Sequence, residues 1–196
     1  MPTARQAVGR TATKRAAAPR ASQPAARSSR AQDAVAILRA DHRLVNELFE
    51  QYEHTRSSAK KQAIVARICE ELTIHAMVEE EIFYPAVKAA LKDKEMVPEA
   101  IVEHATLKEF IAQVNGRAPD GEMFDAKIKV MGEYVKHHVK EEQNEMFPKA
   151  RETRLDLVEL GQRMLARKEE LKADPAGLPK APTAVAELPD QVPQPA

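Results

Sequence analysis

One pattern occurs twice in this chain, and it constrains the fold more than any other feature of the sequence. A histidine is followed four residues later by a glutamate and ten residues later by a proline, as in His75, Glu79 and Pro85. Four residues make about one helical turn, so the histidine and the glutamate lie on the same face of a helix. That face is otherwise apolar. A carboxylate buried there must be paired, protonated or bound to a cation.

The second copy of the pattern is His138, Glu142 and Pro148, and in both copies an aromatic residue precedes the proline. The repeat extends further, because His42 and His104 lie 62 residues apart and His75 and His138 lie 63 apart. Each half of the chain thus holds a helix with one core histidine, then a helix with the paired histidine and glutamate. Two such hairpins facing each other bring together six polar groups: His42, His75, Glu79, His104, His138 and Glu142.

Apolar residues at helical spacing predict four main helices and a fifth. The expected ranges are 33–56 with Asp33 as N-cap, 59–91, about 98 to 115, 121–147, and 149–172. Pro85 should kink or interrupt the second of them. Because the connections are short, neighbouring helices should run antiparallel. The predicted fold is all-α: an up-down-up-down antiparallel four-helix bundle with an additional C-terminal helix and disordered tails.

Composition divides the chain into four parts. Residues 1–31 are predicted to be a disordered basic tail rich in Ala, Pro and Arg, and residues 174–196 a disordered Pro-rich tail. Between them, 32–150 should form the bundle and 151–173 the extra helix. Residues 1–30 hold seven basic residues and no acidic one. Three interpretations of that tail stay open: a solvated tail, a contact with nucleic acid or an anionic surface, or a mitochondrial presequence.

Other features narrow the class of protein. No apolar run approaches the length of a membrane span, so no transmembrane segment is expected. Cys69 is the single cysteine, so an internal disulfide is impossible, and we expect a cytoplasmic protein. The sequence has no nucleophile–base arrangement, no phosphate-binding glycine loop and no zinc-finger spacing.

The six polar groups are therefore the candidate site. A single buried histidine is more often a hydrogen-bonded core residue than a ligand, but four on different helices with two carboxylates favour a metal site. Mixed imidazole and carboxylate ligands suit iron, manganese or zinc, and the lack of thiolates argues against a structural zinc site. Approximate twofold symmetry suggests two metals with the glutamates able to bridge them. A purely structural polar network is the alternative, and it would need several strong compensating pairs.

These motifs resemble the hemerythrin-like family, also called the HHE cation-binding domain. The resemblance covers about residues 33–150 and rests on Asp41-His42, His75-x-x-x-Glu79-Glu80 with Phe83-Tyr84-Pro85, Glu103-His104, and His138-x-x-x-Glu142 with Phe147-Pro148. It implies a four-helix bundle around a non-haem di-iron centre. It further implies that the six groups are iron ligands, with Glu79 and Glu142 as the bridging pair; manganese or zinc is less expected.

By the same resemblance, the expected function is to bind or sense a small ligand: oxygen, nitric oxide or peroxide. We expect a binding protein rather than an enzyme. Two alternatives stay open: a di-iron enzyme that consumes peroxide or oxidises ferrous iron, and a gas- or iron-sensing interaction module. Ferritin-like oxidation ranks second, because ferritin-like sites use more glutamates and a Glu-x-x-His order.

One position departs from the family pattern. Oxygen-carrying hemerythrins have a second histidine one turn after the first on the third helix, where this chain has Lys108. We hypothesise that Lys108 points into or over the site and favours an anionic ligand. The alternative places it at the rim with Leu107 inward. Either way, the departure argues against plain reversible oxygen transport.

Three further assignments are less direct. His137 and Glu141 form their own helical pair, but the register of Pro148 favours His138 and Glu142. Asp41 and Glu103 each precede a candidate ligand. They either accept hydrogen bonds from the imidazoles or lie on the surface. Glu80 and Glu81 are expected to be solvated, with Glu80 a minor candidate ligand.

Overall fold

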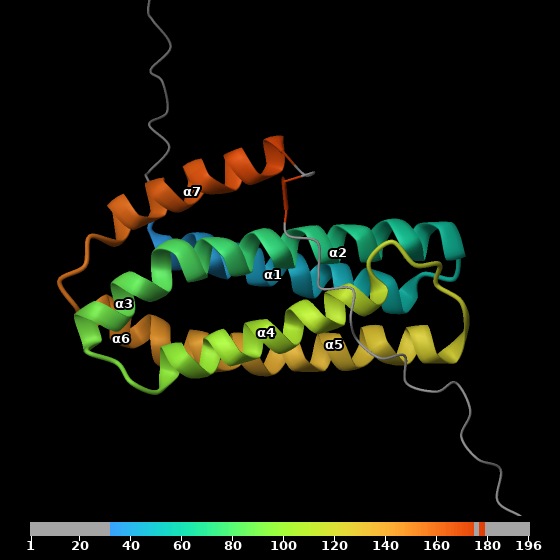
Figure 1. Ribbon diagram of the computed structural model, residues 1–196, viewed down its shortest axis with the longest axis horizontal. Coiled ribbons are helices and arrows are strands. Elements are labelled where there is room, and N and C mark those ends of the chain that lie inside the picture. The colour runs from blue at the N-terminus through green and yellow to red at the C-terminus, as the bar shows by residue number, and fades with distance from the viewer. Residues whose placement is uncertain (1–31, 175–176, 179–196) are drawn as a thin grey trace, which may run out of the picture.

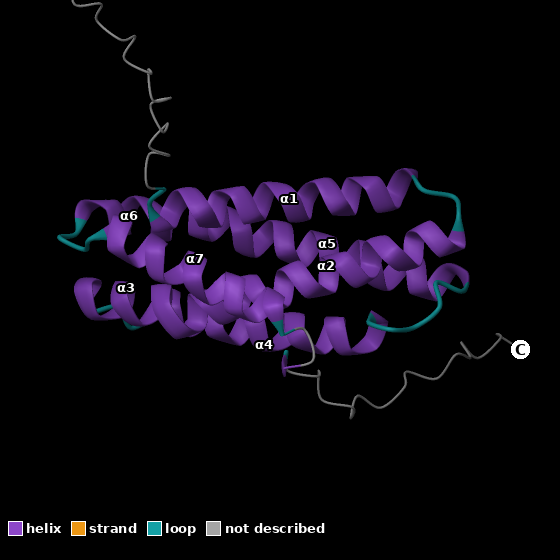
Figure 2. Cartoon of the chain, turned by 90° about the horizontal axis from the view of Figure 1, so that it is seen from above, coloured by secondary structure: helices purple, strands orange, loops and turns teal. Residues whose placement is uncertain are grey.

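The computed structural model describes residues 32–174 and 177–178, and over these residues the chain is helical without a strand. Four long helices form an antiparallel bundle (Figure 1). They are α1 (Ala34–His54), α2 (Ser58–Val78), α4 (Met96–Val114) and α5 (Gly121–Glu141). Their axes stay close to parallel in the perpendicular view (Figure 2). The predicted all-α, up-down-up-down bundle with an extra C-terminal helix is confirmed.

Local sequence signals set the helix ends. Asp33 caps α1 as predicted, because its carboxylate accepts a hydrogen bond of 2.8 Å from the Ala36 amide. At the start of α4, Asp93 accepts from the Val97 amide at the same distance. The helix therefore begins two residues before Pro98. It ends at Val114, and Gly116 then takes a φ of 72°, a conformation that glycine adopts without strain.

Both copies of the histidine–glutamate pattern run into a short π-helical segment. After α2 come η1 (Glu79–Phe83) and α3 (Tyr84–Leu91); after α5 come η2 (Glu142–Met146) and α6 (Phe147–Glu152). A proline inside an α-helix removes one hydrogen bond and crowds the carbonyl four residues earlier. A wider turn just before each proline relieves that crowding, and such turns are frequent at functional sites. The predicted interruption of the second helix at Pro85 is confirmed.

The fifth helix differs from its prediction. The range 149–172 is not continuous: α6 ends at Glu152, and α7 spans Leu157–Ala173. Between them the Thr153 hydroxyl bonds the Ala150 carbonyl, and Asp156 caps α7 by accepting from the amides of Val158 and Glu159. These local hydrogen bonds compete with helical ones and end the first helix.

Helix α7 packs outside the bundle, across α1, α2 and η1 (Figure 1). The close approach depends on Gly161, where an added Cβ would lie 2.5 Å from the carbonyl oxygen of Gln32. No helix of the described residues is long and apolar enough to cross a membrane. The tails predicted for 1–31 and 174–196 lie outside the described residues, except for Asp174, Gly177 and Leu178.

The apolar core has two parts. One cluster joins α3, α6 and α7 to the adjoining ends of α1 and α2, and it includes Phe83, Phe147 and Met164. The other cluster fills the opposite end of the bundle around Phe49 and Met131. Along the bundle, the six candidate ligands lie between these two clusters. They are therefore held on both sides by tightly packed hydrocarbon.

Candidate metal centre

The six predicted site residues are brought together in the middle of the bundle. Each is at most 6 % exposed, and among the described residues they are the polar or charged residues that are buried. Four helices and both π segments supply them: His42 from α1, His75 from α2, Glu79 from η1, His104 from α4, His138 from α5 and Glu142 from η2.

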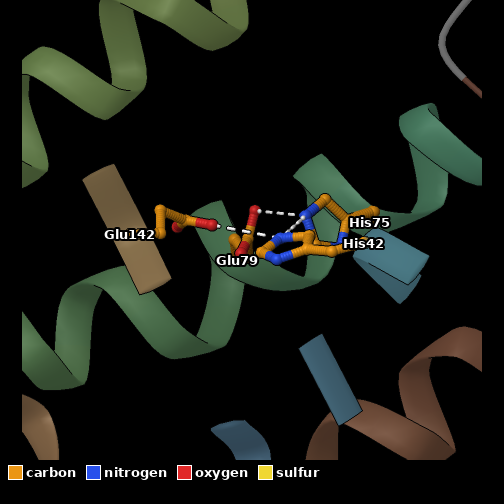
Figure 3. Close-up of side chains that lie close together, drawn as sticks. All are labelled: His42, His75, Glu79 and Glu142. Atoms are coloured by element: carbon orange, nitrogen blue, oxygen red, sulfur yellow. Dashed lines mark hydrogen bonds and ion pairs between the residues drawn. The ribbon is translucent and has the colours of Figure 1, made fainter. Parts of the chain in front are cut away.

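Four of them form a first group (Figure 3). The Nε2 atoms of His42 and His75 are 3.1 Å apart. His75 Nε2 lies 3.2 Å from Glu79 Oε2, and His42 Nε2 lies 3.2 Å from Glu142 Oε2. One carboxylate thus comes from the same half of the chain as the histidines of α1 and α2, and the other from the opposite half.

A second group mirrors the first across the bundle. The Nε2 atoms of His104 and His138 are 3.2 Å apart. Glu79 Oε2 lies 3.4 Å from His104 Nε2, and Glu142 Oε2 lies 3.7 Å from His138 Nε2. Each glutamate therefore faces one histidine of each pair. Both carboxylates thus lie between the two pairs of histidines.

The donor atoms fit a metal ion better than they fit each other. Glu79 Oε1 and Glu142 Oε2 are buried without a hydrogen-bond partner, which is costly for a carboxylate in a dry interior. Burial and the nearby charge of Glu142 raise the pKa of Glu79 well above its usual value. Burial also raises the pKa of Glu142, but the nearby imidazoles of His42 and His138 outweigh it and lower that pKa. A bound cation is the kind of partner that such buried carboxylate oxygens lack.

Burial favours the neutral form at two of the four imidazoles. Burial lowers the pKa of His75 to about 4 and lowers the pKa of His104. For His138 burial again lowers the pKa, but the hydrogen bond to Glu103 outweighs it and the net pKa is raised. A neutral imidazole is the form that binds a metal.

Each histidine has a polar partner on its other ring nitrogen. His75 Nδ1 lies 3.4 Å from Asp41, and His138 Nδ1 lies 2.6 Å from Glu103. These two contacts favour the interpretation of Asp41 and Glu103 as imidazole partners over a surface role. A carboxylate that accepts from Nδ1 keeps the proton there and leaves the Nε2 lone pair free for a metal.

The partners of the other two histidines are Glu80 and Gln143. Glu80 Oε1 lies 3.0 Å from His104 Nδ1, and Gln143 Nε2 lies 3.1 Å from His42 Nδ1. Glu80 is only partly solvated, at 28 % exposed, and this carboxylate also accepts two hydrogen bonds of 2.7 Å from Lys108. Lys108 therefore lies at the rim, 40 % exposed, and Leu107 is the buried neighbour. The hypothesis that Lys108 points into the site is not supported.

One member of the cluster was missed by sequence analysis. The hydroxyl of Tyr84 lies 2.9 Å from Glu142 Oε1, 3.4 Å from Glu79 Oε2 and 3.3 Å from His104 Nε2. In a regular α-helix, five residues turn about 140° and would carry Tyr84 away from Glu79. The π-helical turn of η1 brings it back to the same side. Pro85, which follows Tyr84, was the feature of the sequence that could have indicated this irregular turn.

The predicted register is correct. His137 is 63 % exposed and pairs with Glu141 at 3.1 Å, whereas His138 faces the cluster.

Together the fold and the site define a class: a helical bundle with a buried imidazole–carboxylate cluster suited to metal cations. The family model described as Hemerythrin HHE cation binding domain matches residues 33–150, which is more than half of the chain. The chain belongs to this family.

Two relatives add to this assignment. The fold is similar to the crystal structure of a hemerythrin HHE cation binding domain-containing protein from Mycobacterium kansasii. The TM-score is 0.63 and the identity 23 %, over 73 % of this chain and 89 % of that one, so the likeness concerns the fold. A DNA nickase from Nostoc sp. is 28 % identical over 111 residues, which are 57 % of this chain. This chain spans only 31 % of the length of that relative.

Proposed function

We propose that the protein holds two iron ions in this cluster and binds a small ligand such as oxygen, nitric oxide or peroxide there. One ion would be held by His42 and His75, the other by His104 and His138, with Glu79 and Glu142 shared between them. The observation that carries the proposal is the burial of these six residues together with two carboxylate oxygens that have no hydrogen-bond partner.

The donor chemistry supports iron. Four imidazoles and two carboxylates form a nitrogen–oxygen set without sulfur, which suits iron and manganese and is unlike structural zinc sites. When bound, iron would act as a redox-active Lewis acid. Asp41, Glu80 and Glu103 accept from the Nδ1 atoms of three of the imidazoles and so keep their Nε2 atoms available, and close packing excludes bulk water.

A small enclosed cavity supports a small ligand. Its volume is about 10 Å³, and it lies against all four histidines. Five aliphatic side chains supply most of its remaining wall: Val45, Leu72, Leu107, Val135 and Val139. A cavity of this size holds about one water-sized molecule. It suits a neutral diatomic ligand and excludes larger organic substrates.

The test begins with protein purified without oxygen. We expect two irons per chain by elemental analysis, and optical spectra that change on addition of oxygen, nitric oxide or peroxide. Fewer than one metal per chain after reconstitution would rule out the proposal. A stable adduct indicates a binding protein, whereas rapid loss of peroxide over many turnovers would make it an enzyme.

A cavity-filling variant tests where the ligand binds. Leu107→Phe should weaken or slow ligand binding at least about tenfold, because a larger ring occupies the space beside the imidazoles. The matched control is Ile111→Phe, one turn further along α4 in the same core and absent from the cavity wall. Iron content must stay at two in both variants. Equal ligand binding in both would place the ligand elsewhere.

A further inference from the structure

A second cavity approaches the cluster from its carboxylate side. Its volume is about 70 Å³, and it lies between the first half of α4 and the junction of α5 with η2. Four glutamates line it, together with two methionines, one alanine and two members of the cluster: Glu99, Glu103, Glu141, Glu145, Met96, Met146, Ala100, His138 and Glu142. This cavity is acidic, whereas the smaller one beside the histidines has an aliphatic wall.

The wall of this cavity runs from exposed to buried residues. Glu99 and Glu145 are exposed at its outer end. At the inner end lie His138 and Glu142, which are 5 % and 2 % exposed. Glu142 carries one of the two buried oxygens without a hydrogen-bond partner. The cavity therefore extends from surface carboxylates to the cluster residue that carries this oxygen.

Two of the lining glutamates, Glu103 and Glu141, belong to a third group of donor atoms that has the spacing of a metal site. Glu103, His137 and Glu141 each offer one ligand atom within 4.8 Å of the others. Glu103 is 13 % exposed and Glu141 40 %, so this group lies between solvent and the buried cluster. Glu103 contacts both levels, because it also accepts from His138.

We propose that this acidic cavity is the route by which a divalent cation enters the buried cluster, with Glu103, His137 and Glu141 as a transient outer site. The proposal rests on the function proposed above, because it requires that the cluster be loaded with metal. Carboxylates along a narrow opening raise the local concentration of cations and speed their association. The same charges repel anions and leave neutral ligands unaffected.

One basic group moderates the field at the opening. Lys149 Nζ lies 3.9 Å from Glu145 Oε2 and 3.2 Å from Met96 Sδ. Four glutamates line the cavity, and the Lys149 ammonium offsets only one of their charges, so the cavity wall keeps a negative charge. Lys149 lies beside the lining residues and is not one of them. Removing its charge should therefore speed cation entry, the opposite of removing a glutamate.

The experiment measures the rate of iron uptake by the metal-free full-length chain. Ferrous iron is added without oxygen at low ionic strength, and a chromogenic chelator captures the unbound iron at timed intervals. The variant E99Q/E145Q neutralises two outer glutamates that contact none of the six cluster residues. The matched control is E109Q/E133Q, which removes the same charge from exposed positions on α4 and α5 outside the cavity.

We expect E99Q/E145Q to take up iron about 3- to 10-fold more slowly than the control, with the same final two irons per chain. Added salt should reduce the difference, because screening weakens interactions between exposed charges. Lys149→Gln should load faster than wild type. Equal rates in E99Q/E145Q and E109Q/E133Q, or a salt-independent difference, would overturn the route while leaving the metal centre intact. Absence of uptake by the wild-type chain would instead overturn the proposed function itself.

Discussion

The two halves of the bundle repeat the same backbone but differ in the side chains around the cluster. In each half a histidine and a glutamate are followed by a π segment and a proline. The inner positions match: His75 with His138, and Glu79 with Glu142. The positions one residue after each glutamate do not match, because Glu80 stands where the second half has Gln143. The repeat therefore builds a symmetrical cluster inside an asymmetrical surrounding.

The aromatic residue before each proline differs in the same way. Tyr84 in the first half places its hydroxyl between both glutamates, whereas Phe147 in the second half lies parallel to the His42 ring at 5.8 Å. His104 is backed by a carboxylate and His42 by a neutral amide. The two candidate metal positions therefore have unequal electrostatic surroundings, although their donor atoms are equivalent.

The largest effect should come from the shared glutamates, where the halves are equivalent. Glu79→Ala should lose both metals, because this carboxylate faces one histidine of each pair. Bound metal stabilises the folded chain by about 4 kcal/mol when present at 1,000 times its dissociation constant. The melting temperature in the presence of metal should therefore fall by about 10 °C. Elemental analysis and thermal unfolding measure the two effects.

Glu142→Ala provides the comparison for that variant. The two substitutions should have the same effect on metal content if the carboxylates are equivalent bridges. In metal-free protein Glu79→Ala should be close to neutral, because burial disfavours this carboxylate and one of its oxygens has no hydrogen-bond partner. Glu142→Ala should be more destabilising there, because it removes the acceptor of the Tyr84 hydroxyl. Retention of iron with unchanged melting temperature in either variant would contradict the bridging assignment.

The carboxylates behind the imidazoles should have the next largest effect. Glu103→Gln leaves His138 in place but replaces the acceptor of its Nδ1 proton, so metal affinity should fall about 10- to 100-fold. Asp41→Asn should lower affinity similarly through His75. It should also loosen α7, because Asp41 pairs with Lys168 of that helix. Competition with a chelator measures affinity, and hydrogen exchange in α7 separates the two variants.

These comparisons also show which features the sequence could predict. The bundle, the six cluster residues and the register of His138 follow from periodicity and repeat, which are local properties of helices. Tyr84 could not be placed because a 3.6-residue period assumes an α-helix, and a π turn changes the facing side. Glu80 and Glu81 are indistinguishable in sequence. In the structure Glu80 contacts His104, whereas Glu81 accepts a hydrogen bond from Arg167 of α7.

The break before α7 was missed for a related reason. Leu155 fits the apolar spacing of a helix continuing from α6, yet it lies in the connection, where it packs partly buried against the core. Burial alone does not distinguish a helical leucine from one in a loop. The capping side chains of Thr153 and Asp156 decide the outcome, and their competing hydrogen bonds are weaker signals than periodicity.

The aromatic pair should give a smaller effect. Tyr84→Phe makes the first half resemble the second and leaves Glu142 Oε1 without its donor. We expect the metal-free protein to lose about 1–2 kcal/mol of unfolding free energy, as is usual when a buried acceptor loses its partner. The metal-loaded protein should lose less, since a cation can satisfy the carboxylate. An equal loss in both forms, measured by chemical denaturation, would show that the hydroxyl acts independently of the metal.

The smallest effects should come from the two lysines that pair with Asp41 and Glu80. The burial of each lysine side chain decides which of the two effects is larger. Lys168 is 12 % exposed and pairs with Asp41, whereas Lys108 is 40 % exposed and pairs with Glu80. Lys168→Met keeps the aliphatic stem but leaves Asp41 in a poorly solvated position. It should lower the unfolding free energy by about 1 kcal/mol, the low end for a buried group that loses a partner, because Asp41 keeps its contact with His75.

Lys108→Met is the matched variant in the other half. It should lower the unfolding free energy by less than about 0.5 kcal/mol, because water solvates Glu80 in place of the ammonium. Metal affinity should change less than about threefold in Lys108→Met, since Glu80 still accepts from His104 after the lysine is gone. A larger loss of affinity in Lys108→Met than in Lys168→Met would reverse the order. It would show that Lys108 acts on the cluster through its charge rather than lying only at its rim.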